Sequence, residues 1–414
     1  MEVSSISSNA YSQVRHTTEG LTETLSAEDM VVQSMADASP VKWHLGHTTW
    51  FFETFILQKF ASDYRRFNDT FPFIFNSYYE SAGERHPRPR RGVLTRPSMQ
   101  QVMDYRRYVD EHMMAVLDRA SSELMSLVTV GLHHEMQHQE LLLTDVLHLF
   151  SQNPLLPAVM EAPHREAQMA GASLKWTLNE GGVVSVGAEA SGFSYDCEGP
   201  LHTVLLHPFR LANRLTTNGE WQEFMADGGY KNPLYWLSDG WDYCQRNSWF
   251  APLYWQQKDG GWFQFGLDGL QPINKHAPVC HVSFYEADAF ARWAGKRLPR
   301  EHELEVCVQD EVVFGNLLGE RCWRPQAATG ANENVAQLYG DVWEWTQSAY
   351  SPYPKFSPEQ GALGEYNGKF MANQFVLKGG SCITPKAQMR SSYRNFFYPH
   401  QRWQFMGLRL AEDI

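Results

Sequence analysis

The sequence lacks the features that mark membrane, secreted and nucleic-acid-binding proteins. It has no run of 18 apolar residues and no charged-then-apolar leader, which argues against a membrane span and against secretion. Its six cysteines are scattered without a C-x-x-C pair, so we expect reduced thiols in a cytoplasmic protein. A net charge of −12 argues against nucleic acid as the main partner.

The chain is long and rich in apolar and aromatic residues. Its 414 residues are enough for two or three domains, and a hydrophobic content of 43% is ample for packed cores. Helical periodicity prevails in the first part. The second part has short alternating segments bounded by turn residues, among them Gly181–Gly187, His202–His207 and Gly240–Tyr243, and helical stretches at Thr217–Asp227 and Ser283–Gly295. This pattern indicates a helical domain over residues 1–155, a linker over 156–175 and a mixed α+β domain over 176–414.

The first domain reads as an up-and-down bundle of four helices, preceded by a frayed polar lead-in over residues 1–17. The helices are expected at about Thr18–Leu25, from Ser39-Pro40 onward, from a capping box at Ser98 and Gln101 to about Leu127, and over Leu132–Phe150. Metal sites in such bundles lie between facing helices.

The fourth predicted helix carries two histidines at a spacing that suits a metal ion. His134 and His138 are four residues apart and therefore share one face of the helix. Two imidazoles so placed can bind one ion if a third ligand comes from another segment, and the second helix offers His44 and His47. A single such histidine is more often a hydrogen-bonded core residue. The pair together with a second histidine-rich helix favours a metal site.

The same stretch also matches the H-E-x-x-H pattern of zinc peptidases. Its context is poor for that class, because Leu141 stands where the extended pattern has glycine. The first glutamate beyond the helix that could be a third ligand, Glu161, lies in a Pro-containing stretch. A zinc peptidase is therefore the minor alternative.

An irregular segment over residues 62–97 brings together phenols and guanidinium groups. Tyr78 and Tyr79 follow Asn-Ser and can place phenols near a site. The basic cluster consists of Arg85, Arg88, Arg90 and Arg91. A solvated loop with ordinary salt bridges is the plain interpretation. However, a loop of this length in a compact domain is more often functional, and arginines suit a carboxylate ligand.

Together these motifs resemble those of the ergothioneine-biosynthesis sulfoxide synthases. The resemblance rests on W-H-L-G-H-T-T-W-F-F-E over 43–53, F-N-S-Y-Y-E over 75–80, H-H-E-M-Q-H-Q-E over 133–140, Y-G-D-V-W-E-W-T over 339–346 and Y-R-N-F-F over 393–397. The family joins a DinB-like four-helix bundle to a C-type-lectin-like domain of the formylglycine-generating-enzyme type. The resemblance therefore implies an α+β multidomain fold of this kind.

The resemblance also implies a cofactor and a reaction. The family binds non-haem Fe(II) through three histidines, which correspond to His47, His134 and His138; His47 is preferred to His44 because it stands in the H-T-T-W-F-F-E stretch. Family members use O2 to join a thiol sulfur to C2 of the imidazole of hercynine, and oxidise that sulfur to a sulfoxide. The implied partners are hercynine, O2 and a thiol donor, either γ-glutamylcysteine or cysteine.

Further residues take substrate roles by the same resemblance. Gln137 is expected at the hercynine imidazole, and Asn395, Phe396 and Phe397 at its carboxylate and trimethylammonium group. Arg85 and Arg88 match the basic pair that binds the carboxylates of the thiol donor. Tyr78 and especially Tyr79 are candidate proton or hydrogen-atom donors, although some members use a tyrosine from the C-terminal domain.

Other interpretations stay open. A formylglycine-generating enzyme needs two reactive cysteines near the C-terminus, and Cys382 has no second cysteine after it. A lectin-like binding module would leave the three histidines and the arginine cluster unexplained. The closest alternative is a selenoneine synthase, which joins selenium from a selenosugar to hercynine on the same scaffold and would differ only in the donor pocket.

Overall fold

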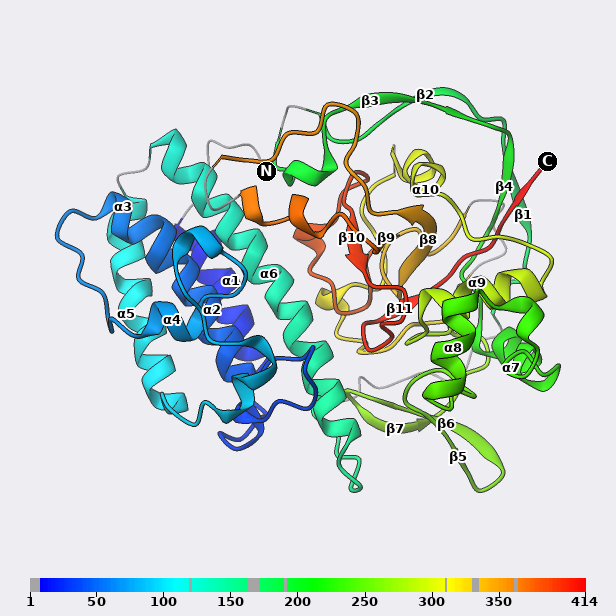
Figure 1. Ribbon diagram of the computed structural model, residues 1–414, viewed down its shortest axis with the longest axis horizontal. Helices are drawn as coiled ribbons and strands as arrows, with labels where there is room; N and C mark the ends of the chain where they lie inside the picture. Colours follow the sequence, from blue (N-terminus) through cyan, green and yellow to red (C-terminus); the bar gives the residue numbers. More distant parts are fainter. Residues whose placement is uncertain are drawn as a thin grey trace. The chain divides into compact units, whose positions relative to one another are not determined.

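Two compact units make up the fold of the computed structural model (Figure 1). The structure describes residues 8–118, 121–161, 171–189, 192–309, 311–329, 335–360 and 364–414. Unit 1 consists of Met1–Pro154 with two short pieces from later in the chain, Ser191–Phe193 and Pro358–Gly368, and unit 2 is the remainder. Local sequence patterns predicted no such return of the chain to the first unit. Residues 162–170 of the predicted linker lie outside the described residues.

Unit 1 is built from helices, the longest of which lie side by side in Figure 1. Its α-helices are α1 (Ser8–Gly20), α2 (Val41–Phe52), α3 (Gln58–Phe60), α4 (Phe71–Phe75), α5 (Met99–Leu117) and α6 (Ser122–Ser151). Helix α2 packs against both α5 and α6, and α1 packs against α6. The predicted helical bundle is confirmed.

The first predicted helix is misplaced, because α1 begins ten residues before the expected Thr18. Its buried residues are Tyr11, Arg15 and Thr18, which recur at the helical spacing of four and three. Because these three side chains carry polar groups, apolar periodicity does not detect the helix that they belong to. Packing on the bundle, rather than apolar content, determines this helix. Residues 1–7 lie outside the described part.

The third predicted helix also differs from the structure at its end. Its capping box is confirmed, since the Ser98 hydroxyl accepts the Gln101 amide and the Gln101 side chain accepts the Ser98 amide. However, α5 stops at Leu117 instead of Leu127, and α6 starts at Ser122. The Ser121 side chain accepts the amide of Leu124 and so caps a new helix where the sequence pattern suggested continuation.

The end of α2 is held by a buried carboxylate. A π-helical turn, η3 (Glu53–Leu57), follows α2 directly. Glu53 is buried and accepts hydrogen bonds from the Tyr64 hydroxyl at 2.7 Å and the Tyr105 hydroxyl at 2.6 Å. Tyr105 belongs to α5, so this bond ties the helix that carries His47 to a second helix of the bundle. A buried carboxylate needs such donors to offset its desolvation.

Unit 2 is an α+β structure of several small sheets. Its strands are β1 (Trp176–Asn179), β2 (Gly182–Val186), β3 (His202–Leu206), β4 (Phe209–Ala212), β5 (Trp255–Lys258), β6 (Gly261–Gly266), β7 (Gly269–Pro272), β8 (Trp343–Ala349), β9 (Phe375–Lys378), β10 (Asn395–Phe397), β11 (Met406–Gly407) and β12 (Ala411–Asp413). The strand orders are β10-β9-β8-β11, β1-β4-β12, β5-β6-β7 and β2-β3. Within the first sheet β11 runs parallel to β8, and the other pairs are antiparallel.

Helices of unit 2 accompany these sheets. They are α7 (Asn218–Ala226), α8 (Ser238–Arg246), α9 (Phe284–Trp293) and α10 (Glu301–Val308). Helices α7 and α9 and strands β2 and β3 confirm the sequence expectation. The expectation of a short strand at Gly240–Tyr243 is wrong, because this stretch lies in α8. Gly240 and Cys244 are buried four residues apart, and a Cβ on Gly240 would lie 2.8 Å from Tyr285. Among the described residues, no helix has the length and apolar character needed to cross a membrane.

Candidate metal centre

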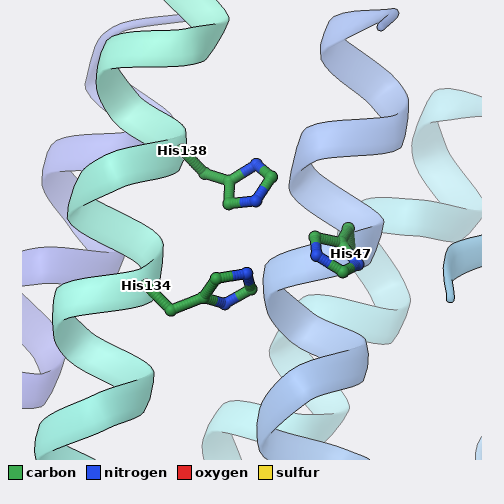
Figure 2. Close-up of side chains that lie close together, drawn as sticks. All are labelled: His47, His134 and His138. Carbon is green, nitrogen blue, oxygen red and sulfur yellow. The ribbon is translucent and has the colours of Figure 1, made fainter. Parts of the chain in front are cut away.

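Three buried histidines of unit 1 face one another (Figure 2). His134 and His138 project from α6 toward His47 on α2, and one potential ligand atom of each lies within 4.8 Å of the others. Their exposed fractions are 0% for His47, 1% for His134 and 9% for His138. The structure thus brings together the three histidines that the sequence singled out, and their role as ligands stays a prediction.

All three imidazoles are held in the neutral form. Burial, followed by the neighbouring His134 imidazole, lowers the pKa of His47 and of His138 well below the usual value. Burial also lowers the pKa of His134 to about 3. A neutral imidazole keeps a nitrogen lone pair at neutral pH, which is the form that binds metals.

Several nitrogen atoms of this cluster lack a hydrogen-bond partner among the described residues. They are Nε2 of His47 and both ring nitrogens of His134, all buried. Nδ1 of His47 lies 2.6 Å from the carbonyl oxygen of Phe75, so Nδ1 donates and Nε2 keeps the lone pair. Buried polar atoms are rarely left unsatisfied in native proteins. A set of three imidazole nitrogens fits a divalent transition-metal ion.

Aromatic rings enclose His47. The Trp43 ring stacks on it at a centroid distance of 4.5 Å, and the Trp50 ring at 5.4 Å. Gly46 has no side chain, and a Cβ there would lie 2.2 Å from the ring of Phe75, the residue whose carbonyl holds His47. This close approach explains a glycine inside α2, where glycine otherwise costs about 1 kcal/mol.

Sequence spacing alone left His44 and His47 as alternatives, the resemblance favoured His47, and the two histidines have different contacts in the structure. His44 lies behind the cluster, with Nδ1 2.8 Å from Nδ1 of His138 and Nε2 3.0 Å from a carboxylate oxygen of Asp145. Both ring nitrogens of His44 are therefore occupied. His47, not His44, has a nitrogen left for a metal ion.

The glutamate of the H-E-x-x-H pattern is engaged elsewhere. Glu135 accepts hydrogen bonds from Arg15 at 2.8 Å and from Arg106 at 3.0 Å, and all three side chains are buried. Burial alone would raise the pKa of Glu135, but the two guanidinium groups lower it to about 2. A peptidase general base needs a pKa near the working pH and access to water. The geometry therefore argues against the zinc peptidase alternative.

A piece of the second half of the chain joins the tyrosines of unit 1. The Tyr366 hydroxyl donates to the Gln137 side chain, and its ring lies 5.8 Å from the ring of His134. Tyr79 is fully buried, and its ring centroid is 4.7 Å from that of Tyr78 and 6.5 Å from that of Tyr366. The structure thus adds Tyr366 to the predicted residues. In the sequence Tyr366 stands in the stretch G-E-Y-N-G-K-F over 364–370, which also resembles the family, and some members of that family use a tyrosine from the C-terminal domain.

The segment that carries Tyr366 is anchored to the loop after Tyr79. Glu365 accepts the backbone amides of Glu80 at 3.0 Å and Ser81 at 2.9 Å. It also accepts the Ser81 hydroxyl at 2.6 Å. Such charge-assisted bonds to backbone donors are stronger than neutral ones.

The arginine cluster divides into exposed and buried members. Arg85 forms a salt bridge to Glu80 at 2.7 Å, with exposed fractions of 38% and 65%, and Arg88 donates to the carbonyl of Asp37. Arg91 is only 4% exposed, with its guanidinium carbon 3.3 Å from the centroid of the Trp43 ring. In the described part of the chain no carboxylate forms a salt bridge with Arg91, and its Nε has no partner.

The remaining predicted residues belong to unit 2. Asn395, Phe396 and Phe397 form β10 and are half-buried. The Phe396 ring stacks on Tyr350 at 4.1 Å, and the Asn395 side-chain oxygen accepts the Phe396 amide at 2.9 Å. Their place in a substrate site stays a prediction.

Comparisons with protein families match both parts of the chain. Residues 10–148 match the DinB superfamily, and residues 165–312 and 319–414 match the sulfatase-modifying factor enzyme 1-like domain. These matches confirm the predicted fold class, in which a DinB-like helical region precedes a formylglycine-generating-enzyme-like region.

Curated relatives cover much of the chain. A protein of Mycolicibacterium smegmatis named hercynine oxygenase is 37% identical over 309 residues, which are 68% of this chain and 70% of that protein. The hercynine oxygenase of Mycolicibacterium thermoresistibile is 32% identical over 402 residues, 91% of this chain and 88% of its own. Ergothioneine biosynthesis protein 1 of Schizosaccharomyces pombe is 27% identical over 235 residues, 53% of this chain and 28% of its own.

Proposed function

Since this chain belongs to the hercynine oxygenase family, we propose that it is an Fe(II)- and O2-dependent sulfoxide synthase of ergothioneine biosynthesis. The reaction joins the sulfur of a thiol to C2 of the hercynine imidazole and oxidises that sulfur to a sulfoxide. The observation that carries the proposal is the buried cluster of His47, His134 and His138. Neutral imidazoles with unsatisfied nitrogens in a ring-lined interior suit a metal better than they suit a packed core.

The three histidines would hold the iron. When bound, Fe(II) supplies the open coordination positions at which O2 and substrates meet. The chain contributes the surroundings. Trp43 and Trp50 stack on His47, and Phe51 lies with its ring 4.7 Å from that of His134. These rings fix the ligand planes and exclude water, which strengthens electrostatic interactions inside the site.

Gln137 is proposed to contact the imidazole of hercynine. Gln137 stands between the two histidines of α6 in the sequence, and Tyr366 donates to its side-chain oxygen. That bond fixes the orientation of the amide, so that it can present its NH2 group to a bound imidazole. Asn395, Phe396 and Phe397 are proposed for the carboxylate and the trimethylammonium group, because a quaternary ammonium binds aromatic faces.

Arginines are proposed to hold the carboxylates of the thiol donor. Arg85 and Arg88 follow from the resemblance, and Arg91 joins them because its buried guanidinium has no carboxylate partner among the described residues. Burial lowers the pKa of Arg91. A ligand carboxylate would relieve this unfavourable burial of an unpaired charge.

A phenol is proposed as the proton donor at the reacting sulfur and oxygen atoms. Tyr79 is fully buried beside Trp50 and Phe51, with ring centroids 5.5 and 6.4 Å away. Burial raises the pKa of its neighbour Tyr78, which favours the protonated form. A protonated phenol in such a place can give a proton to a developing anion.

The deciding experiment is a product assay after anaerobic reconstitution with Fe(II). Hercynine and O2 are added with γ-glutamylcysteine, cysteine or a selenosugar in parallel, and mass spectrometry identifies the product. A hercynine sulfoxide conjugate from one thiol is expected and names the donor. A selenium conjugate alone would replace the proposal by selenoneine synthesis.

The His134→Ala variant is the matched control for the metal. It should lose bound iron and product formation while its circular dichroism stays that of the wild type. An active, iron-free variant would contradict the proposal. So would bound metal without O2 uptake or product with any of the three donors.

A further inference from the structure

A second layer of two side chains lies behind His138 in unit 1. His44 sits between His138 and Asp145, 2.8 Å from one and 3.0 Å from the other. His44, His138 and Asp145 are all buried. Asp145 follows His138 by two helical turns on α6, so both point from the same face of that helix.

The Asp145 carboxylate, at the far end of this hydrogen-bonded series of side chains, is fixed in place. The Asp145 oxygen that faces His44 also accepts the backbone amide of Ser39 at 2.7 Å. The Ser39 hydroxyl in turn accepts Nη1 of Arg91 at 2.9 Å. The segment that leads into α2 is therefore bound to α6 through Asp145, and the acceptor cannot move away from His44 without breaking that bond.

The proton positions along the chain follow from donor and acceptor chemistry. An ionised carboxylate only accepts, so Nε2 of His44 must donate to Asp145. A neutral His44 then has a lone pair on Nδ1. Because Nδ1 of His44 faces Nδ1 of His138, the hydrogen between them must belong to His138. His138 consequently carries its proton on Nδ1, and its lone pair is on Nε2.

We propose that His44 and Asp145 are positioning residues, which hold His138 in the tautomer whose Nε2 can bind the metal ion. This inference rests on the proposed function, because it concerns the metal centre of that site. Metal-bound histidines usually donate their other N–H to an acceptor that sets the ring orientation and raises ligand basicity. Here the acceptor is an imidazole, which accepts only while Asp145 keeps the proton of His44 on Nε2.

The other two histidines show why His138 needs this arrangement. His47 donates to the Phe75 carbonyl, a fixed acceptor that sets its tautomer without help. His134 has no partner at either nitrogen among the described residues. The tautomer of His47 is thus set by a backbone carbonyl, and that of His138 by the side chains of His44 and Asp145. Neither kind of partner sets the tautomer of His134. Removing Asp145 should act through His44, so the two losses should not add in a double-mutant cycle.

The test uses two readouts, and the first needs no metal. Selectively 15N-histidine-labelled, metal-free protein is studied by NMR, with His138→Gln to identify the signals of His138. The expected wild-type result is a proton on Nδ1 and none on Nε2. His44→Ala and Asp145→Leu should both release this preference and give averaged nitrogen shifts.

The second readout is anaerobic titration of the metal-free protein with Co(II), followed by visible absorption. His44→Ala and Asp145→Leu should each weaken binding about 10- to 100-fold. His44→Gln should recover part of the loss, because its amide can accept from His138 and donate to Asp145. Thr144→Val is the matched control, since Thr144 is also buried beside Asp145 and its hydroxyl donates to the Leu141 carbonyl at 2.8 Å; it should bind like the wild type.

The outcomes separate the two proposals. A proton on Nε2 of His138 in the wild type, or unchanged Co(II) affinity in His44→Ala, would overturn the positioning role and leave the proposed function standing. A wild type that binds no Co(II), with affinity equally absent in His134→Ala, would overturn the proposed function together with this role. A fixed tautomer with weakened binding in both variants, and wild-type binding in the control, would support it.

Discussion

Two neighbouring faces of α6 are equally buried and opposite in character. The ligand face carries His134 and His138, whose imidazoles are neutral, and both ring nitrogens of His134 lack a hydrogen-bond partner among the described residues. The ion-pair face carries Glu135, whose two carboxylate oxygens are bound by Arg15 and Arg106. We propose that the ligand face binds a cation from outside the chain, whereas the carboxylate of the ion-pair face is already paired with two cationic side chains of the chain itself.

The difference shows how much a short motif depends on its partners. The H-E-x-x-H pattern places a glutamate beside two histidines both in zinc peptidases and in this protein. In this bundle the glutamate points to α1 and α5, where two arginines neutralise it. The residue types match the peptidase pattern, but Glu135, which would be the general base, is bound in two buried salt bridges. The function of each position is decided by what lies opposite it.

The largest expected effect breaks the ion-pair face. Glu135→Leu leaves Arg15 and Arg106 without this buried partner and should lower the free energy of unfolding by about 3–5 kcal/mol. Urea unfolding of metal-free protein measures the change. Gln139→Leu is the control, because Gln139 is as buried and bonds to Val14 and Thr18 of α1 without a charge; it should cost about 1 kcal/mol. Equal losses would contradict the electrostatic origin.

The pH dependence of stability sharpens the same contrast. Glu135 has a pKa of about 2 in the folded protein, below its value of about 4.3 in unfolded chains. A lowered pKa means that the stabilisation is present above pH 4.3 and disappears as the pH falls toward 2. Glu135→Gln should lack this component, so its stability should depend less on pH by roughly 3 kcal/mol over that window. Parallel curves for the two proteins would refute the assignment.

On the ligand face, the next effect concerns the phenols. Tyr79→Phe should lower the rate of sulfoxide formation about 100-fold, because a positioned general acid contributes about that much. Tyr366→Phe removes the bond to Gln137 and should raise the KM for hercynine more than it lowers kcat. Steady-state kinetics with the preferred donor distinguish them. The reverse pattern would make Tyr366 the proton donor.

The smallest expected effect comes from an ion pair outside both faces. Lys59 and Glu123 lie 2.6 Å apart with exposed fractions of 54% and 63%. Lys59→Ala should change the free energy of unfolding by less than about 1 kcal/mol, since water and salt screen such pairs. A loss comparable to that of Glu135→Leu would show that burial is not what separates the two kinds of pair.

Local spacing was enough to predict that two histidines share one face of α6. His134 and His138 do so by sequence distance alone, whereas the second histidine-rich helix offered both His44 and His47, and the resemblance to the family selected His47. The capping box at Ser98 and the strands β2 and β3 were equally local, and all are present. Signals of this kind act over a few residues, which is why reading the chain in order finds them.

What the sequence could not predict depends on contacts between distant residues. Glu135 meets Arg15 across 120 positions, and Gln137 meets Tyr366 across 229. Arg91 looked like one member of a basic loop, yet it is buried on Trp43. Hydrophobic periodicity cannot predict such pairs, because the residues come together only in the folded protein. The contacts of His44 were open for the same reason, since its partner Asp145 lies 101 positions away in the sequence.

The segment Pro358–Gly368 has a consequence for how this protein can be taken apart. Although it follows eight strands of unit 2 in the chain, it belongs to unit 1 and brings Glu365 and Tyr366 to the helices. A gene fragment that ends at the apparent domain boundary would encode the three histidines but omit Glu365 and Tyr366, which contact the same unit. The two parts of the chain match separate family models, but a chimaera that exchanges unit 2 must keep this segment with unit 1.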